Sequence, residues 1–398
     1  MPQRIALELQ ALVAETRRKY PDVRQSADHL LAQWQADADR TVSELQSCKD
    51  PSSHALLQMI VLACETRSPK VIQLALSLLQ SSIPLRILPD TSLATVIDTL
   101  HTLLSAPGRT DVDVQLKILQ IVSSLLVTYA NVTSELLSRA LMLCFTLYEH
   151  SRVAVVSSTA AAMLRQNVMV VFEKVQSEDQ SFDAIQNEDA AVNAPLPVGT
   201  AELPSGPVTL FPCAADVYHL LNDLCALADG QPAHFLPLDT LSKPFVLELL
   251  ESVLTTQSSL FQRHPELVYI LRSAACPFLL KALSKPPASF SVYIRVMRLV
   301  ALLLCEYHKE IVLEVEMLLR ALLDTLDEKH ALWQRVLAWE TMRSLSADSA
   351  FLTFLWDQFD GQAEPICVLG RLVECVQQFS RRLRSTLVVD DALAAALE

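Results

Sequence analysis

The stretch Val112-Asp-Val-Gln-Leu-Lys-Ile-Leu-Gln-Ile-Val-Ser-Ser-Leu-Leu-Val-Thr-Tyr129 decides the fold class. Its apolar residues recur at steps of three and four, and they form two adjoining stripes. The first stripe contains Val112, Leu116, Leu119, Val122, Leu126 and Tyr129, and the second contains Ile118, Ile121 and Leu125. A surface helix shows a single apolar face, so two adjoining stripes predict a helix that packs between neighbours in a stack.

The same kind of helix recurs along the chain with short connections. In the first half we expect helices near 4–20, 26–47, 53–65, 69–82, 91–105, 112–129, 133–148 and 153–176. In the second half we expect them near 214–227, 241–257, 264–283, 287–306, 308–326, 330–346, 349–359 and 364–386. Second helices of successive pairs begin near 69, 112 and 153, a step close to the HEAT and armadillo length of about 40–47. This step predicts an all-α, armadillo/HEAT-like solenoid in two halves, with a helical bundle as the alternative.

Composition excludes several classes of protein. Only 6 of the 398 residues are glycine, which argues against sheets joined by tight turns and against phosphate-binding loops. The net charge of −13 repels nucleic acid and anionic lipid, so we expect no nucleic-acid partner and membrane attachment only through a partner protein or a local patch. No apolar run approaches the roughly 20 residues that span a bilayer. Nine scattered cysteines suit small buried side chains in a reducing compartment, and we expect a cytoplasmic chain.

The composition changes between Ser177 and Pro212, where acidic residues are followed by proline and glycine. We therefore expect residues 177–212 to be an acidic, proline-rich flexible linker between helical halves at 1–176 and 213–386. The final segment, 387–398, resembles a helix start that is cut short. For that reason we expect the polypeptide to be a fragment of a longer protein.

The sequence predicts no catalytic, cofactor-binding or metal site. Its nine histidines stand far apart, and none lies at ligand spacing from a cysteine. Motifs for a serine nucleophile and for phosphate binding are absent. His308 falls at an expected helix junction, where we expect a solvated side chain.

Three groups of charged residues stand out. Two of them are the basic clusters Arg17-Arg-Lys-Tyr20 and Arg381-Arg-Leu-Arg384, each at the end of an expected helix. Positive charge at that position complements the helix dipole. The alternative is that the clusters contact a phosphoinositide or the acidic face of a partner protein. Arg165 follows the small residues Ala160-Ala-Ala162, which permit close helix packing. A lone arginine there is usually an internal ion pair or a clamp on carbonyl oxygens, so we expect Arg165 to be a structural polar residue.

Several segments, in order, carry a family resemblance. They are Leu12-Val-Ala-Glu-Thr-Arg-Arg-Lys-Tyr-Pro21, Cys64-Glu-Thr-Arg-Ser-Pro-Lys-Val-Ile-Gln-Leu-Ala-Leu76, Ser157-Ser-Thr-Ala-Ala-Ala-Met-Leu-Arg-Gln166, Val170-Val-Phe-Glu-Lys174 and Leu247-Glu-Leu-Leu-Glu-Ser-Val253. Together they resemble the N-terminal region of the Mon-two (Ysl-two) proteins, relatives of the large Arf guanine-nucleotide exchange factors. The resemblance implies an armadillo-like fold, with a dimerisation and cyclophilin-binding (DCB) domain at 1–176 and a homology-upstream-of-catalytic (HUS) domain at 213–386.

The resemblance also implies a function and partners. It implies a non-catalytic scaffold of Golgi and endosome vesicle traffic, peripheral on trans-Golgi and endosome membranes. The implied partners are an Arf-like small GTPase, a Dopey-type protein, a phospholipid flippase and a second copy bound through the first domain. A candidate partner surface is the helix that bears Pro69, Lys70, Leu76 and Leu79, because it lies early in the first domain.

Phe359 and Asp360 are candidate inter-domain residues. The exchange factors carry a box of Asn-Tyr-Asp-Cys-Asp, and the matching place is Gln358-Phe-Asp-Gly-Gln362, where only the aromatic residue and the following aspartate agree. This partial match looks like the non-catalytic Mon-two branch.

Two other classes of protein compete with this interpretation. One is an unrelated helical-repeat adaptor of the nuclear-transport or phosphatase-regulatory type, although the four tryptophans form no repeated ladder of the importin kind. The other is an Arf exchange factor or its N-terminal regulatory part. Nucleotide exchange on an Arf protein needs a catalytic glutamate in a separate helical domain. The two helical halves occupy nearly all of the residues, so we expect no such domain in this chain.

Overall fold

The computed structural model describes residues 2–36, 51–105, 111–187, 196–285, 289–327, 329–361, 369–374 and 377. The chain divides into two compact units, which we describe separately. The first unit comprises residues 1–220 and 234–238, and the second comprises residues 221–233 and 239–398. Residues 387–398 lie outside the described residues.

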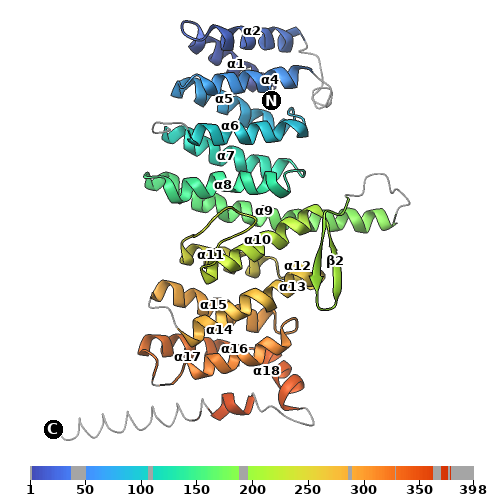
Figure 1. Cartoon of the computed structure of the whole chain (residues 1–398), viewed down its shortest axis with the longest axis vertical. Helices are drawn as coiled ribbons and strands as arrows, with labels where there is room; N and C mark the ends of the chain where they lie inside the picture. The colour runs from blue at the N-terminus through green and yellow to red at the C-terminus, as the bar shows by residue number, and fades with distance from the viewer. Residues whose placement is uncertain are drawn as a thin grey trace, which may run out of the picture. The chain divides into compact units, whose positions relative to one another are not determined.

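The first unit is a stack of antiparallel helix pairs (Figure 1). Its helices are α1 (Pro2–Thr16), α2 (Pro21–Ala36), α4 (Pro51–Glu65), α5 (Pro69–Ser82), α6 (Leu93–Ser105), α7 (Val112–Thr128), α8 (Ser134–His150) and α9 (Ala154–Asn187). Helices α1, α5, α7 and α9 pack in succession as one row, and α2, α4, α6 and α8 form the other. The short 3-10 turns Ile83–Leu85 and Asp90–Ser92 connect α5 to α6. The two rows confirm the predicted helical solenoid.

Helix α7 shows why the sequence pattern predicted this fold. It contacts α5 and α9 in its own row and α8 in the other. Both predicted stripes contribute buried side chains, which include Ile118, Leu119, Ile121, Val122, Leu125 and Leu126. Burial on two sides removes far more apolar surface from water than one face could, so α7 needs both neighbours.

The repeat of about 40 residues also appears in the hydrogen bonds between layers. Gln73 donates to Asp113 across 3.2 Å, and Gln80 donates to Gln120 across 3.2 Å, each pair 40 residues apart. Buried Asn167 accepts from Ser123 across 2.6 Å, 44 residues away. Equivalent positions of successive repeats therefore face one another, as in a solenoid.

The flexible linker expected at residues 177–212 is not confirmed. Helix α9 continues to Asn187, and β1 (Gly199–Leu203) and β2 (Gly206–Leu210) form an antiparallel hairpin with Gly199 opposite Leu210. The hairpin packs on the first turns of the next helix through Ala201, Leu210 and Ala215. Glu178, one of the acidic residues that suggested a linker, accepts the backbone N–H groups of Cys213 and Ala214 at 3.2 Å each. The acidic residue caps a helix instead of remaining solvated.

Helix α10 (Pro212–Asp229) contributes its first turns to the first unit and its remainder to the second. The second unit continues with α11 (Lys243–Thr256), α12 (Ser258–Arg263), α13 (Pro265–Ile270), α14 (Cys276–Ser284), α15 (Phe290–Glu306), α16 (Val312–Asp324), α17 (Leu332–Ala347) and α18 (Ser349–Leu355). The π-helical turns Leu271–Ala275 and Trp356–Asp360 follow α13 and α18. Helix α11 packs against α15 and α15 against α17, while α14 packs against α16. This unit is therefore also built from layered helices.

Two helical segments of the described chain, Ala154–Asp183 and Pro265–Ser284, are long and apolar enough to cross a bilayer by length and composition alone. Such windows also occur in core helices. Val168, Phe172 and Val175 of the first segment are buried in its unit, and so are Leu267, Leu271 and Leu279 of the second. Packing against neighbouring helices accounts for the apolar character of these buried side chains.

Candidate functional site

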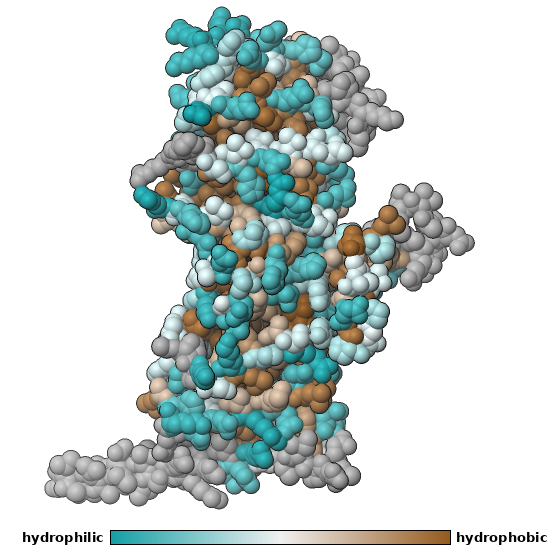
Figure 2. Space-filling model, viewed as in Figure 1, coloured by the Kyte–Doolittle hydropathy of each residue, from teal (hydrophilic) through white to brown (hydrophobic). Residues whose placement is uncertain are grey.

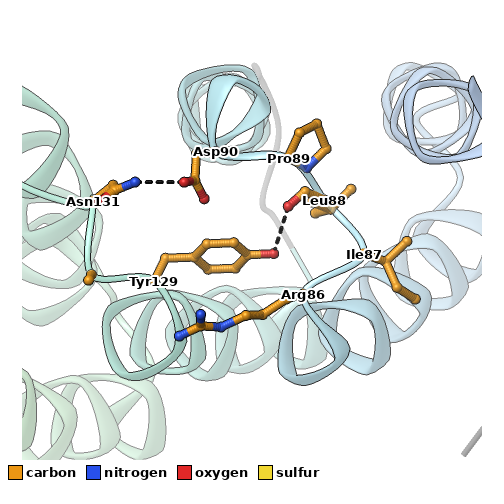
Figure 3. Close-up of a pocket in the computed structure, with 8 residues that line it drawn as sticks. Arg86, Ile87, Leu88, Pro89, Asp90, Tyr129 and Asn131 are labelled. Carbon is orange, nitrogen blue, oxygen red and sulfur yellow. Dashed lines mark hydrogen bonds between the residues drawn. The ribbon is translucent and has the colours of Figure 1, made fainter. Parts of the chain in front are cut away.

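A cavity of about 330 Å³ lies where the α5–α6 connection meets the α7–α8 connection. Residues 86–90 line one side of it and residues 129–131 line the other (Figure 3). The ring of Tyr129 crosses the cavity toward Leu88, with Arg86 on one side of the ring and Asp90 on the other. The cavity is therefore formed by two successive repeats.

Three hydrogen bonds join the two repeats at this cavity. Tyr129 donates its hydroxyl to the carbonyl oxygen of Leu88 at 3.0 Å, and Asn131 donates to Asp90 at 2.6 Å. Arg86, whose φ of 51° is left-handed, donates to the carbonyl oxygen of Thr128 at 2.7 Å. Burial, reinforced by the charge of Asp90, raises the pKa of Tyr129 to about 12. The phenol therefore stays protonated at neutral pH, and its hydroxyl joins the two repeats.

Substituting Tyr129→Phe is expected to destabilise the first unit by about 1–3 kcal/mol. The ring still fills its place, but the buried carbonyl oxygen of Leu88 loses its donor. Urea denaturation compared with wild type measures the change. Asn131→Ala is the control, because its bond to Asp90 joins two exposed side chains and its loss should cost less. Equal losses in the two variants would contradict the structural role of Tyr129.

A second polar cluster lies where α9 meets the α7–α8 connection and the start of α10. Lys174 donates to the carbonyl oxygens of Tyr129 at 3.0 Å and Val132 at 3.3 Å. Asp216, which is 2% exposed, accepts the backbone N–H of Ser134 at 2.7 Å. Ser134 has a left-handed φ of 55°, so this bond holds the first residue of α8 in an uncommon conformation.

Burial determines the protonation of this cluster. It raises the pKa of Asp216 to about 7, although the Ser134 N–H and the positive charge of Lys174 oppose the shift. Burial also lowers the pKa of Lys174 and raises that of Glu178. Each of these groups bonds to backbone atoms at the ends of helices. The arrangement fixes the α7–α8 connection and supports a structural role for the cluster.

The cysteine thiols of the described chain are not activated. Cys64, Cys144, Cys225 and Cys276 are buried, and burial raises the pKa of each to about 12. A thiol at this pKa carries almost no nucleophilic thiolate near neutral pH. Among the described residues, no three His, Cys, Asp or Glu side chains come together as metal ligands would.

Only two of the four residues of the candidate partner surface on α5 are exposed. Pro69 and Lys70 are exposed, but Leu76 is fully buried and Leu79 is 2% exposed. The prediction that Leu76 and Leu79 contact a partner therefore needs correction, because both point into the packed interior. A position early in the chain did not reveal which face of α5 packs against α1 and α7. Arg165 is half-buried on α9, and its predicted ion pair or carbonyl clamp stays a prediction.

Comparison with protein families assigns both halves of the chain. The model for the DCB domain of Mon2/Sec7/BIG1-like proteins, the dimerisation and cyclophilin-binding domain, matches residues 2–179. The model for the HUS domain of the same proteins matches residues 213–365. The chain belongs to the Mon2/Sec7/BIG1-like family. The resemblance predicted from the ordered segments is thereby confirmed.

Curated relatives from distant eukaryotes place the chain near the Mon2 members of this family. It is 29% identical over 394 residues to the Homo sapiens "Protein MON2 homolog", covering 94% of this chain and 22% of the human protein. It is 30% identical over 399 residues to the Caenorhabditis briggsae protein of that name, covering 92% and 24%. It is 26% identical over 394 residues to the Saccharomyces cerevisiae "Protein MON2", covering 94% and 22%. The chain spans less than a quarter of the length of these relatives.

Within the Mon2/Sec7/BIG1-like HUS region, the two box residues have defined surroundings. Phe359 is 4% exposed in the π-helical turn Trp356–Asp360, and its ring centroid lies 6.1 Å from that of Phe354. Asp360 accepts the backbone N–H of Gly370 at 3.2 Å. Both contacts lie inside the second unit. The predicted inter-domain role of Phe359 and Asp360 therefore stays a prediction.

The polar cluster of half-buried Lys174 and buried Asp216 is the feature that sequence reasoning missed. Lys174 ends the apolar run Val168-Met-Val-Val-Phe172 with a single intervening glutamate, which is the same signal that drew attention to Arg165. A cation on an otherwise apolar helix face usually has a buried partner. The sequence could not show that Asp216, 42 residues further on, lies near enough to influence the charge of Lys174.

Proposed function

We propose that this chain is a non-catalytic scaffold of Golgi and endosome vesicle traffic, which binds proteins through the outer surfaces of its stacked helices. The observation that carries the proposal is the order of a DCB match and a HUS match along one chain of helical repeats. The surroundings of the buried polar groups support it. Tyr129, Lys174 and Asp216 bond to backbone atoms that hold helices together.

The proposed partners follow from the family. They are an Arf-like small GTPase, a Dopey-type protein, a phospholipid flippase and a second copy bound through the DCB domain. The description of that domain as a dimerisation and cyclophilin-binding domain supports self-association. We place the protein at the periphery of trans-Golgi and endosome membranes, held there by proteins because its net charge of −13 disfavours anionic lipid. The proposed limits of the DCB and HUS domains remain 1–176 and 213–386.

A pull-down with purified Golgi-type Arf and Arf-like GTPases, each loaded with GTP or GDP, tests the proposal. The purified chain is the bait, and we expect one GTPase to be retained in its GTP form only. An effector contacts the nucleotide-dependent switch segments, so selectivity for the nucleotide separates specific binding from adsorption. Retention that does not depend on the nucleotide would contradict the GTPase part of the proposal.

A second candidate function is the N-terminal regulatory part of an Arf exchange factor. The Sec7 and BIG1 members named in both family models support it. The partial box at Phe359 and Asp360 favours the Mon2 branch instead. Nucleotide exchange on the same GTPases, measured with the purified chain, is expected to stay at the spontaneous rate. The alternative of an unrelated helical-repeat adaptor does not agree with the family membership.

A further inference from the structure

Two connections that are distant in sequence lie together at one edge of the first unit. The hydroxyl of Tyr20, in the α1–α2 connection, donates to the carbonyl oxygen of Thr66 in the α4–α5 connection at 3.2 Å. Helix α1 packs along α5, which brings the end of α1 to the start of α5. Residues 17–20 and residues 66–70 therefore form one continuous surface.

This surface, the basic edge, concentrates positive charge. It is formed by five exposed cationic residues, Arg17, Arg18, Lys19, Arg67 and Lys70. None of the five forms an ion pair or a side-chain hydrogen bond with any other residue in the described ranges. Other exposed cations of the described chain, such as Arg4 and Arg24, pair with a nearby carboxylate. The chain as a whole carries a net charge of −13, so this edge is a local reversal of sign.

The backbone adds to the positive potential. Helix α5 begins at Pro69, and the side chain of Ser68 at its N-cap makes no capping hydrogen bond. The N-terminus of a helix carries a partial positive charge, which here points to the same edge as Arg67 and Lys70. Arg67 also has a left-handed φ of 56°. The face of the first unit seen in Figure 2 carries mainly hydrophilic residues at the end where α2 lies.

We propose that the basic edge binds an acidic segment, rich in Asp and Glu, of a partner protein. The inference rests on the proposed scaffold function and identifies one of its binding surfaces by charge. Unpaired exposed cations attract an anionic partner at long range and form new ion pairs on contact. The exposed pyrrolidine of Pro69 gives the segment an apolar contact between the charges.

Features of the edge favour a protein segment over an anionic membrane. The exposed acids Glu15, Asp22 and Glu65 neighbour the five cations in sequence. An anionic lipid surface would contact the cations and also be repelled by these neighbouring acids. A peptide can instead position its carboxylates beside the cations and away from the acids. The one aromatic residue of the edge, Tyr20, is half-buried with its hydroxyl bonded to Thr66, so it is not free to insert among lipids.

Fluorescence anisotropy of a labelled Asp/Glu-rich peptide, titrated with the whole purified chain, measures the interaction. We expect saturable binding that weakens as salt is added, because exposed charges are screened. Replacing all five cations of the basic edge by glutamine should weaken binding by about tenfold or more. The single charge reversal Lys70→Glu should weaken it measurably without altering the thermal unfolding of the chain.

The control variant replaces five exposed cations of the second unit by glutamine, and they are Lys285, Arg298, Arg320, Lys329 and Arg343. It has the same net charge as the basic-edge variant. Comparing the two variants therefore distinguishes an effect of the basic edge on peptide binding from an effect of the net charge of the chain. Binding that is lost in the basic-edge variant and kept in the control supports the proposal. Equal loss in both variants, or no binding by wild type, overturns it.

A parallel titration uses phosphatidylcholine vesicles with and without phosphatidylserine. Binding of the acidic vesicles, but not of the peptide, in a manner that depends on the five cations would overturn the protein-segment assignment in favour of a membrane contact. The scaffold proposal is tested by the GTPase pull-down, so the two can fail separately. A chain that retains a GTPase but not the peptide keeps the proposed function and loses this inference.

Discussion

Replacing Tyr307 by alanine is expected to lower the free energy of unfolding of the second unit by about 4 kcal/mol, as large-to-small changes of buried aromatic residues do. Tyr307 directly follows α15 and is 1% exposed. Its ring packs edge-on against Phe261 with centroids 5.3 Å apart, and its hydroxyl donates to the carbonyl oxygen of Leu254 at 2.6 Å. Alanine leaves a cavity where α15 meets the end of α11, and it also leaves that carbonyl without a donor.

Urea denaturation, with hydrogen exchange to assign the transition to α11 and α15, measures the loss. Tyr307→Phe keeps the ring and removes only the hydroxyl, so it should cost about 1–3 kcal/mol. The difference between the two variants isolates the packing of the ring. If alanine costs no more than phenylalanine, the ring does not stabilise the second unit in the way that its burial indicates.

Replacing Lys174 by methionine is expected to destabilise the first unit by about 3 kcal/mol, because a nearby cation is removed while the buried carboxyl of Asp216 remains. The change removes both hydrogen bonds to the α7–α8 connection, and it leaves Asp216 without its compensating cation. Methionine preserves most of the apolar stem, so the loss reports the charge. Lys70→Met is the control, since Lys70 is exposed and its loss should change stability by less than about 0.5 kcal/mol.

The cost of Lys174→Met should also depend on pH. The pKa of Asp216 is about 7 in the folded chain and lower when unfolded, so its contribution to stability falls as pH rises from about 4 to about 7. Without Lys174 that pKa rises further, and the fall continues above pH 7. The variant should therefore lose more stability at about pH 8 than at about pH 6. Adding Asp216→Asn should remove this extra pH dependence; if it persists, another group is responsible.

Sequence patterns predicted the helices well because helix periodicity is a local property. The predicted helix at 69–82 has the observed bounds, and α7 and α9 begin within one residue of their predicted starts. Proline at the first turn of α5 and the apolar stripes of α7 depend only on residues within a few turns. The repeat step followed from these starts, and the stacked rows confirm it.

Predictions that depended on partners distant in sequence were less accurate. Residues 177–212 suggested a linker by composition, but Glu178 caps α10 and the hairpin packs on that helix. His308 was expected to be solvated, but it is 6% exposed and its ring lies 4.6 Å from that of Phe354. In each case a polar residue is withdrawn at least partly from solvent because a distant segment supplies contacts for it.

The sequence by itself determined the all-helical class, the repeat of about 40 residues and the family, because each of these depends on local order along the chain. The tertiary structure alone decided which faces of those helices remain exposed. Stacking buried Leu76 and Leu79 of α5, brought Lys174 near Asp216, and joined the cations of two connections at Tyr20. In a solenoid each repeat packs against its neighbours, so the contacts with the adjacent repeat determine which face of a helix is buried.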